Sequence, residues 1–187
     1  MKKEKPCMPK ETADCGGRES LLSEVEPFRT IVVMIGIPGS GKTTFRRTYF
    51  SDLAVISLDL LHRRKREDAV LRDVLASGRS CVIDNTDVSR AERAKYLSTA
   101  RDAGYRTVGV YMRSDTEECL ARNELRSGKA RIPRVGVLAR AKALELPSRK
   151  EGFDRLFYVT ISKNGFTISN WEEDHEKTDP RLADETI

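Results

Sequence analysis

The feature that most constrains this chain is an apolar run that passes directly into a glycine-rich turn. Residues 29–35 read RTIVVMI, and residues 36–43 read GIPGSGKT, which matches the pattern G-x-x-x-x-G-K-[ST]. The run predicts a buried strand, and a helix is predicted to open at Lys42. A strand, a glycine-rich loop and a helix in this order point backbone N–H groups and the positive helix end at phosphate groups. We therefore expect a phosphate-binding loop here.

The same stretch supplies the candidate nucleotide ligands. We expect Lys42 to reach the β- and γ-phosphates of ATP and to act in catalysis, and the Thr43 hydroxyl to hold Mg²⁺. Glycines in the loop let the backbone curl around the phosphates. The full set of loop residues expected to bind the nucleotide is Gly36, Ile37, Pro38, Gly39, Ser40, Gly41, Lys42, Thr43 and Thr44.

Strand and helix patterns alternate along the chain after this loop. Such alternation predicts an α/β fold of the P-loop NTPase kind, a parallel sheet covered by helices on both faces. Ligands then bind at the carboxyl ends of the strands, which places the loop, Asp59 and Asp84–Thr86 along one edge. The predicted strands cover residues 29–35, 53–59, 80–86 and 106–112, and a closing strand with a C-terminal hairpin covers residues 155–171.

Helical patterns fill the intervals between these strands. They cover residues 60–78, 89–104, 116–126 and 137–146. Ser89 and Glu92 have the spacing of a capping box at the start of the second of these helices. Gly78 and Gly104 stand where a glycine commonly ends a helix.

Two aspartates follow predicted strands at the ligand edge. Asp59 ends the run VISLD, and we expect it to be the general base that takes a proton from the attacking hydroxyl. An N-cap for the next helix is its alternative role. Asp84 in CVIDNT is expected to hold Mg²⁺ through water or to bind the substrate, and the alternative is a turn residue that caps its own backbone.

A basic segment is predicted to supply further cations. Arg122 and Arg126 lie four residues apart on one helix face, directly before SGKARIP. Residues 122–150 contain nine basic and two acidic side chains, too few acids for ordinary ion pairing. We expect an arginine-bearing helical lid that closes over ATP and brings both arginines to the nucleotide, with Arg126 acting in catalysis. A solvated basic face is the alternative.

Charge divides the chain into three parts. Residues 1–28 predict a flexible leader, residues 29–171 the folded domain, and residues 172–187 an acidic tail. The domain has 27 basic and 16 acidic side chains, a net charge of +11, which favours a polyanionic partner such as nucleic acid. The chain has no 18-residue apolar run, no secretory signal and no CxxC pair. We therefore expect no membrane partner and an intracellular, reducing compartment, cytoplasmic or nuclear.

Several segments together are typical of one family. They read GIPGSGKTTF, ISLD, CVIDNTDVSRAERAKYLSTARDAG, ARNELR, RIPRVGV and EGFDRLFYV. With them the chain, from about Thr30 to Ile161, resembles the kinase domain of polynucleotide 5′-hydroxyl kinases. The resemblance implies that the γ-phosphate of ATP is transferred to the 5′-hydroxyl of RNA or DNA. It also implies Asp59 as the base, Arg126 as the lid cation, and Asp84 on the substrate side.

Other arginines are candidates for contacts with the nucleic acid. Arg90 and Arg93 lie three residues apart at the start of the helix after IDNT, where plain surface charge is the alternative. The resembled family has asparagine–arginine–aspartate where this chain has Ser57-Leu58-Asp59, so leucine replaces a cation. Arg63 or Arg64, one turn later, is expected to compensate, unless the run RRKR faces solvent.

Two other functions stay open. A P-loop kinase of a small metabolite or nucleoside-linked hydroxyl, similar to gluconate kinases and zeta-type toxins, would share the loop, base and lid, and suits Leu58. A nucleotide-binding module without chemistry is the third hypothesis, although such a module needs neither base nor lid. The chain has no D-x-D-G-T phosphatase motif, so we expect a kinase that acts alone or with a separately encoded phosphatase or ligase.

Overall fold

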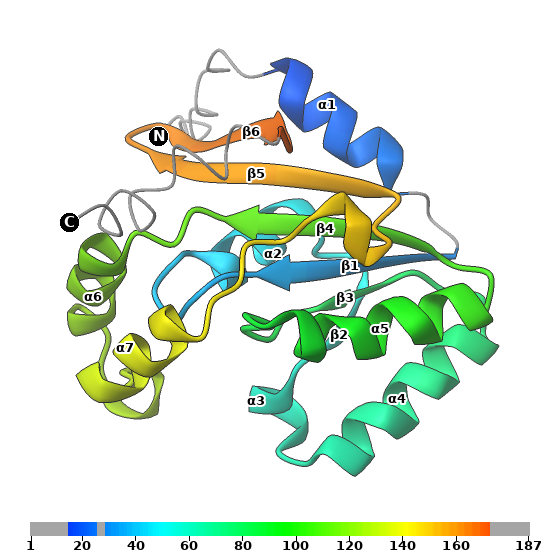
Figure 1. The fold of residues 1–187 in the computed structure, drawn as a ribbon, viewed down its shortest axis with the longest axis horizontal. Coiled ribbons are helices and arrows are strands. Elements are labelled where there is room, and N and C mark those ends of the chain that lie inside the picture. The colour runs from blue at the N-terminus through cyan, green and yellow to red at the C-terminus, as the bar shows by residue number, and fades with distance from the viewer. Residues whose placement is uncertain (1–14, 26–28, 173–187) are drawn as a thin grey trace, which may run out of the picture.

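The computed structural model describes residues 15–25 and 29–172, in which six strands form a single sheet (Figure 1). The strand order is β2-β3-β1-β4-β5-β6. The first five strands in this order are parallel, and β6 pairs with β5 in an antiparallel hairpin. The predicted parallel sheet and C-terminal hairpin are thereby confirmed. The strands are β1 Thr30–Ile35, β2 Ala54–Ile56, β3 Cys81–Ile83, β4 Arg106–Met112, β5 Arg155–Ser162 and β6 Gly165–Asn170.

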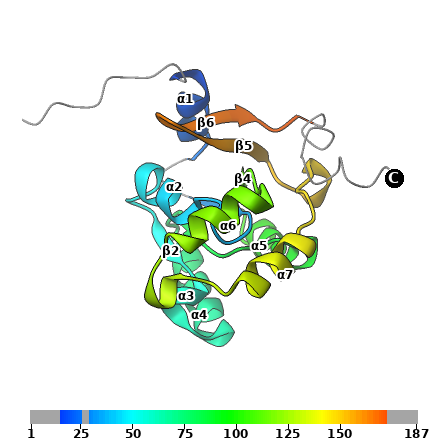
Figure 2. The ribbon, with the colours of Figure 1, turned by 90° about the vertical axis from the view of Figure 1, so that its left-hand side faces the viewer.

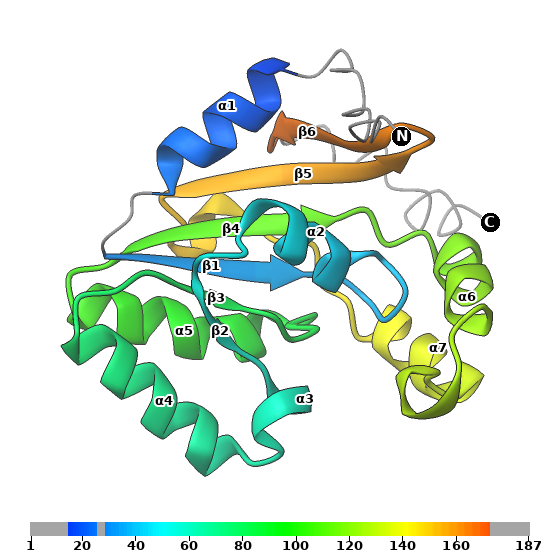
Figure 3. The same ribbon diagram turned by 180° about the vertical axis from the view of Figure 1, so that it is seen from behind.

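Helices cover both faces of this sheet. The helices α4 and α5 lie on one face, and α1 and α2 lie on the other (Figures 1 and 3). Every residue of β1 is buried, because its alternate side chains enter two different cores. The helices are α1 Cys15–Glu24, α2 Lys42–Tyr49, α3 Leu58–Leu61, α4 Arg64–Ala76, α5 Arg90–Asp102, α6 Thr116–Glu124 and α7 Arg134–Lys142. None of those helices is long and apolar enough to cross a membrane.

Local signals place most helix ends where they were predicted. Helix α5 begins with the expected capping box, in which the Ser89 hydroxyl accepts the Glu92 N–H at 3.2 Å and the Glu92 carboxylate accepts the Ser89 N–H at 3.0 Å. Helices α4 and α5 end before Gly78 and Gly104, both with positive φ. Helix α7 begins at Arg134, earlier than predicted, and Pro133 is its N-cap residue.

The segment around Asp59 differs from its prediction. Strand β2 ends at Ile56 rather than at Asp59, and the helix expected over residues 60–78 is two helices, α3 and α4. The helices part at His62, whose φ of 60° is left-handed. The cause is a tertiary contact, because the Asn85 side chain accepts the Leu58 N–H at 2.8 Å and so satisfies the start of a helix.

Helix α1 lies within the segment predicted as a flexible leader. It packs beside β6 (Figure 1) and buries Leu21 completely in the core that contains Phe45. At its end, Glu24 pairs with Arg106 and, at 2.7 Å, with Arg155. The prediction of a flexible leader is therefore wrong for Cys15–Glu24. Residues 1–14, and residues 173–187 of the predicted acidic tail, lie outside the described residues.

Replacement of Leu21 by alanine tests whether α1 is part of the stable fold. We expect a loss of about 2 kcal/mol in the free energy of unfolding, at the low end for buried leucine because the site lies at the edge of the sheet and can collapse. Urea unfolding measures this loss. The matched control is Leu22→Ala, since that side chain is 40% exposed. Equal stabilities of the two variants would contradict the packing of α1.

Candidate active site

The glycine-rich loop joins β1 to α2 at the edge where the parallel strands end. Figure 2 looks onto this edge, which α2, α3, α6 and α7 surround. The loop is tied to its neighbours by two hydrogen bonds, from the Gly36 N–H to the Thr86 carbonyl at 3.1 Å and from the Ile37 N–H to the Ser114 hydroxyl at 3.2 Å. Gly39 has φ of +91°, and a Cβ there would lie 2.2 Å from the Cys119 carbonyl oxygen. The loop therefore packs directly on α6, and only glycine fits at this point.

Lys42 spans the inside of the loop. Its buried ammonium donates hydrogen bonds to the carbonyls of Gly36 at 2.7 Å and Ile37 at 2.9 Å. Burial lowers the pKa of Lys42 to about 8, and the Asp84 carboxylate opposes that shift. Lys42 is therefore still charged at neutral pH. A cation at the centre of a curled backbone fits a polyphosphate chain.

Asp84 lies beside the start of α2. Its carboxylate accepts a hydrogen bond from the Thr43 hydroxyl at 3.4 Å and pairs with the Arg46 guanidinium at 3.3 Å. Carboxylate and hydroxyl oxygens are ligands that suit Mg²⁺. The described residues contain no group of three metal-binding side chains, so a Mg²⁺ ion here would take its remaining ligands from phosphate oxygens and water.

Sequence reasoning missed Arg46. A signal was available, since Arg46 follows Thr43 by three residues and therefore shares its helix face. Its guanidinium is largely buried against Asp84, and its positive charge balances the negative charge of that carboxylate.

Asp59 is exposed on the short helix α3, next to Leu58 at the helix start. The N-cap of α3 is Ser57, so the alternative role of Asp59 as an N-cap is wrong. Two contacts tie this segment to the turn after β3: the Leu58 N–H donates to Asn85, and the Asp84 N–H donates to the Ile56 carbonyl at 2.9 Å. The two predicted acids are thus carried by neighbouring segments that bind one another.

The two lid arginines lie in different environments. Arg122 donates to the Gly39 carbonyl at 2.8 Å and pairs with Glu118 at 3.2 Å, so it holds the phosphate loop against α6. Arg126 is exposed after α6, and its side chain has no hydrogen bond or ion pair with any described residue. Arg126 is therefore free to approach a nucleotide.

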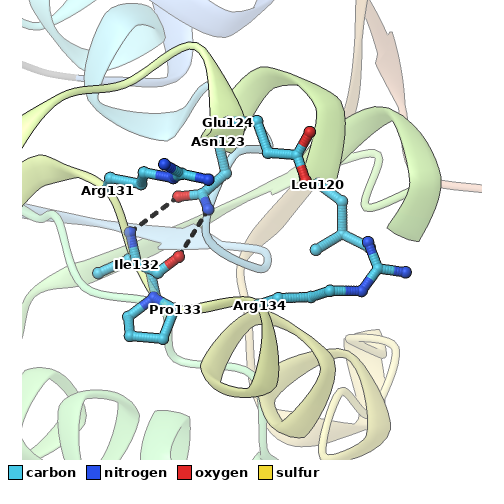
Figure 4. A pocket seen from close by; sticks show the side chains of 7 residues that line it. All are labelled: Leu120, Asn123, Glu124, Arg131, Ile132, Pro133 and Arg134. Carbon is cyan, nitrogen blue, oxygen red and sulfur yellow. Dashed lines mark hydrogen bonds between the residues drawn. The ribbon is translucent and has the colours of Figure 1, made fainter.

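Two hydrogen bonds join the ends of the loop between α6 and α7, which belongs to the predicted lid. The Asn123 amide donates to the Ile132 carbonyl at 2.7 Å and accepts the Ile132 N–H at 3.0 Å (Figure 4). Ile132 in turn packs against the cluster that contains Ile37 of the phosphate loop. A pocket of about 240 Å³ lies between α6 and the start of α7, with Arg131 and Arg134 among its lining residues.

The four arginines predicted to contact the nucleic acid separate into two groups. Arg63 and Arg90 are exposed, and Arg64 is half-exposed, although it pairs with Glu67 at 3.0 Å. Arg93 is fully buried and forms a two-pronged pair with Glu151, both bonds at 2.7 Å. It also donates to three backbone carbonyls. The prediction that Arg93 contacts a strand is wrong, because all its donors are already directed inward.

Asp87 is a buried carboxylate that sequence reasoning did not single out. It is 1% exposed, and its Oδ2 has no hydrogen-bond partner within residues 15–25 and 29–172. Burial raises the pKa of Asp87 to about 8, and the charges of Glu92 and Glu67 act in the same direction, against Arg64 and Lys42. The folded protein therefore holds a proton on Asp87 up to about pH 8, whereas the unfolded chain loses it near the ordinary pKa of 3.8.

The Asp87→Asn protein is expected to be more stable than the wild type, by an amount that grows between pH 4 and pH 8. Folding then takes up a proton on Asp87, so its contribution to stability falls as the pH rises through this range, and asparagine removes that dependence. Asparagine also tolerates the φ of +40°. Urea unfolding at pH 5 and pH 8 measures the gain, with the exposed Asp102→Asn as control. A gain no larger at pH 8 than at pH 5 would be evidence against a protonated Asp87.

Comparisons with known proteins agree with this geometry. Residues 31–147 match the model of the AAA domain family AAA_33. A protein of Acanthamoeba polyphaga mimivirus, provisionally named a bifunctional polynucleotide phosphatase/kinase, is 29% identical over 141 residues, which are 71% of this chain and 34% of that protein. The chain spans about a third or less of the length of the curated relatives that it matches. The resemblance expected from the sequence is thus confirmed at the level of similarity.

Solved structures show the fold. A gluconokinase from Sinorhizobium meliloti 1021 has a TM-score of 0.54 at 19% identity, covering 74% of this chain and 86% of that one. The AvrRxo1-ORF1:-ORF2 complex with ATP has a TM-score of 0.60 at 13% identity, covering 87% and 68%. The fold is that of the P-loop kinases, and the family model covers well over half of the sequence. The chain therefore belongs to the AAA domain family.

Proposed function

We propose that this protein transfers the γ-phosphate of ATP to the 5′-hydroxyl end of an RNA or DNA strand. The observation that carries the proposal is the anchoring of the three parts of the site to one turn, Asp84–Thr86. Thr86 binds the phosphate loop, Asp84 binds Thr43, and Asn85 binds the helix that carries Asp59. The resemblance to the mimivirus protein supports the choice of substrate.

Each part has a distinct chemical role. The loop backbone and Lys42 hold the β- and γ-phosphates, and Thr43 and Asp84 would hold Mg²⁺. Bound Mg²⁺ neutralises charge on the phosphate oxygens. Asp59 accepts the proton of the attacking hydroxyl as the oxygen–phosphorus bond to the acceptor forms and the bond to the β-phosphate oxygen breaks. Exposure of Asp59 leaves it accessible to the end of a large substrate.

The surface charge around the site supports a polyanionic acceptor. Exposed cations stand on several elements near the ligand edge, and the domain carries a net charge of +11. Phosphate contacts of this kind make binding strongly dependent on salt. The exposed cations concerned are Arg63, Arg90, Arg126, Lys129, Arg131 and Arg134.

A small-molecule acceptor is the second candidate. Leu58 and Leu60 flank Asp59, and Leu60 is 65% exposed, so the immediate neighbours of the proposed base are apolar. A compact neutral substrate needs no cation there. The rate with such a substrate would change little with ionic strength.

Transfer of labelled phosphate from ATP tests both candidates. The acceptors are matched single-stranded RNA and DNA with a 5′-hydroxyl, the same strands with a 5′-phosphate, gluconate and nucleosides. We expect transfer to a 5′-hydroxyl strand, a steep decline with salt, and a decrease of about 10²–10⁴-fold in kcat for Asp59→Asn with unchanged affinity for ATP. The exposed Asp52→Asn is the control. Transfer to a small hydroxyl but to neither strand would favour the second candidate.

A further inference from the structure

A buried carboxylate, Glu67 on α4, lies behind the candidate active site. It is completely buried, which is costly for a charged group unless it is well hydrogen-bonded. Four donors surround it: the Asn85 amide at 2.7 Å, the Tyr96 hydroxyl at 2.8 Å, and the cations of Lys95 and Arg64, each at 3.0 Å. All of its acceptor capacity is thus in use.

The network keeps Glu67 ionised. Burial by itself raises the pKa of this carboxyl, but the hydrogen bonds from Tyr96, Arg64, Lys95 and Asn85 outweigh burial and bring it below the ordinary 4.5. The charge matters for geometry, because an ionised carboxylate only accepts hydrogen bonds. The Asn85 amide must therefore turn its NH₂ group toward Glu67.

The orientation of the Asn85 amide determines which of its atoms faces α3. Its NH₂ group donates to Glu67 and, at 2.9 Å, to the Tyr96 hydroxyl. Its carbonyl oxygen must then point the other way, where it accepts the Leu58 N–H at 2.8 Å. Leu58 is the first residue of α3, and Asp59 is the second. Asn85 also follows Asp84 directly in the chain, so the residue that binds α3 is the chain neighbour of the second acid.

Apolar packing between α4 and α5 does not require a charged side chain at Glu67. Apolar side chains at Leu71, Val74 and Leu97 already join α4 and α5 in the core. The polar network adds a directional hydrogen bond to α3, a helix of only four residues whose Leu61 packs partly against this core. A helix this short is not stable without tertiary support.

We infer that Glu67 is a positioning residue, which acts through Asn85 to hold α3 and Asp59 in place relative to Asp84. This inference rests on the proposed function, in which Asp59 is the general base. Glu67 itself touches neither nucleotide nor acceptor. Its removal therefore changes the rate of transfer and not the affinity for ATP.

The test variant is Glu67→Gln, which keeps the size of the side chain but replaces one of its two acceptor oxygens by an NH₂ group. The cations of Lys95 and Arg64 attract the remaining oxygen, so the NH₂ group is left facing Asn85. We expect kcat to fall about 10–100-fold, as for loss of a supporting partner, with the Kd for ATP within twofold of the wild type. Hydrogen exchange of the backbone amides in Leu58–Leu61 is expected to accelerate, while that of the phosphate-loop helix stays unchanged. Lys95→Met is the control, since it removes one cation but keeps the Glu67–Asn85 bond; its kcat should change less than threefold.

Two further variants complete the test. Asn85→Ala is expected to reproduce the loss of Glu67→Gln, and the double variant should be no worse than the more severe single one, because the two residues act as one unit. Tyr96→Phe, unlike Lys95→Met, removes a hydrogen-bond acceptor of the Asn85 amide, the Tyr96 hydroxyl, and it replaces Glu67→Gln if that protein does not fold. It should show the same faster exchange in α3.

The outcomes separate the inference from the proposed function. Unchanged exchange of the α3 amides in Glu67→Gln, or in Tyr96→Phe where it stands in, would overturn the positioning role, whatever Asp59 does. Additive losses in the double variant would overturn it too. Full activity of Asp59→Asn would instead refute the general base, while faster exchange in α3 would still show that Glu67 holds this helix.

Discussion

Replacement of Arg126 by alanine is expected to lower kcat for phosphate transfer on the order of 10³-fold, with little change in the affinity for ATP. Arg126 is exposed after α6 and has no partner among the described residues, so its charge is available to the γ-phosphate when the lid closes. The neighbouring Arg122 cannot replace it, because Arg122 is bound to the Gly39 carbonyl. Single-turnover kinetics with labelled ATP measure the chemical step.

The control for this variant is Arg134→Ala, which removes an exposed arginine from the α7 side of the same lid. We expect Arg134→Ala to weaken acceptor binding modestly and to leave the single-turnover rate nearly unchanged. A similar loss in both variants would mean that the net charge of the lid matters rather than one cation. A rate within threefold of the wild type for Arg126→Ala would refute a catalytic role.

Replacement of Arg93 by methionine is expected to reduce the free energy of unfolding by about 3 kcal/mol, because it leaves the partly buried Glu151 carboxylate without its ion-pair partner. Three carbonyls, of Asp87, Val88 and Glu145, lose a donor at the same time. For a chain of this size the loss corresponds to a fall in Tm on the order of 10 °C. Calorimetry and urea unfolding measure it.

Two further variants test whether removal of the Arg93–Glu151 ion pair causes this loss of stability. Arg90→Met, three residues earlier on the exposed side, should change stability by less than about 0.5 kcal/mol. The double variant Arg93→Met/Glu151→Leu should recover part of the loss, because it leaves no uncompensated charge. A stable Arg93→Met protein with weakened RNA or DNA binding would reverse our assignment and restore the contact expected from the sequence.

The prediction for Asp59 shows where sequence patterns become ambiguous. The run VISLD suits both a strand that extends to the aspartate and a strand that stops earlier. The choice depends on Asn85, which lies 27 residues beyond Leu58 in the chain and accepts its N–H. A pattern within one segment contains no information on this distant acceptor, so the strand end was misplaced, and the role of Asp59 stays a prediction.

The two arginines of α5 that were predicted to contact the substrate show that charge in the sequence does not reveal the role of a side chain either. Arg90 and Arg93 are both arginines in the first turn of the same predicted helix, and charge alone offers no reason to separate them. In the folded protein Arg90 is exposed, whereas Arg93 is buried against Glu151, a residue 58 positions away. The role of a charged side chain depends on its partners, and these come from distant parts of the chain.

The sequence by itself determined what depends on neighbouring residues. It specified the phosphate loop, because glycines and a following helix set that backbone locally, and it specified the capping box of α5 and the alternation that produces a parallel sheet. Only the tertiary structure decided where Asp59 stands, that Arg93 is internal, and that Asp84 is paired with Arg46. The physical reason is that burial and hydrogen bonding change the state of a side chain, and both are set by contacts between segments far apart in the chain.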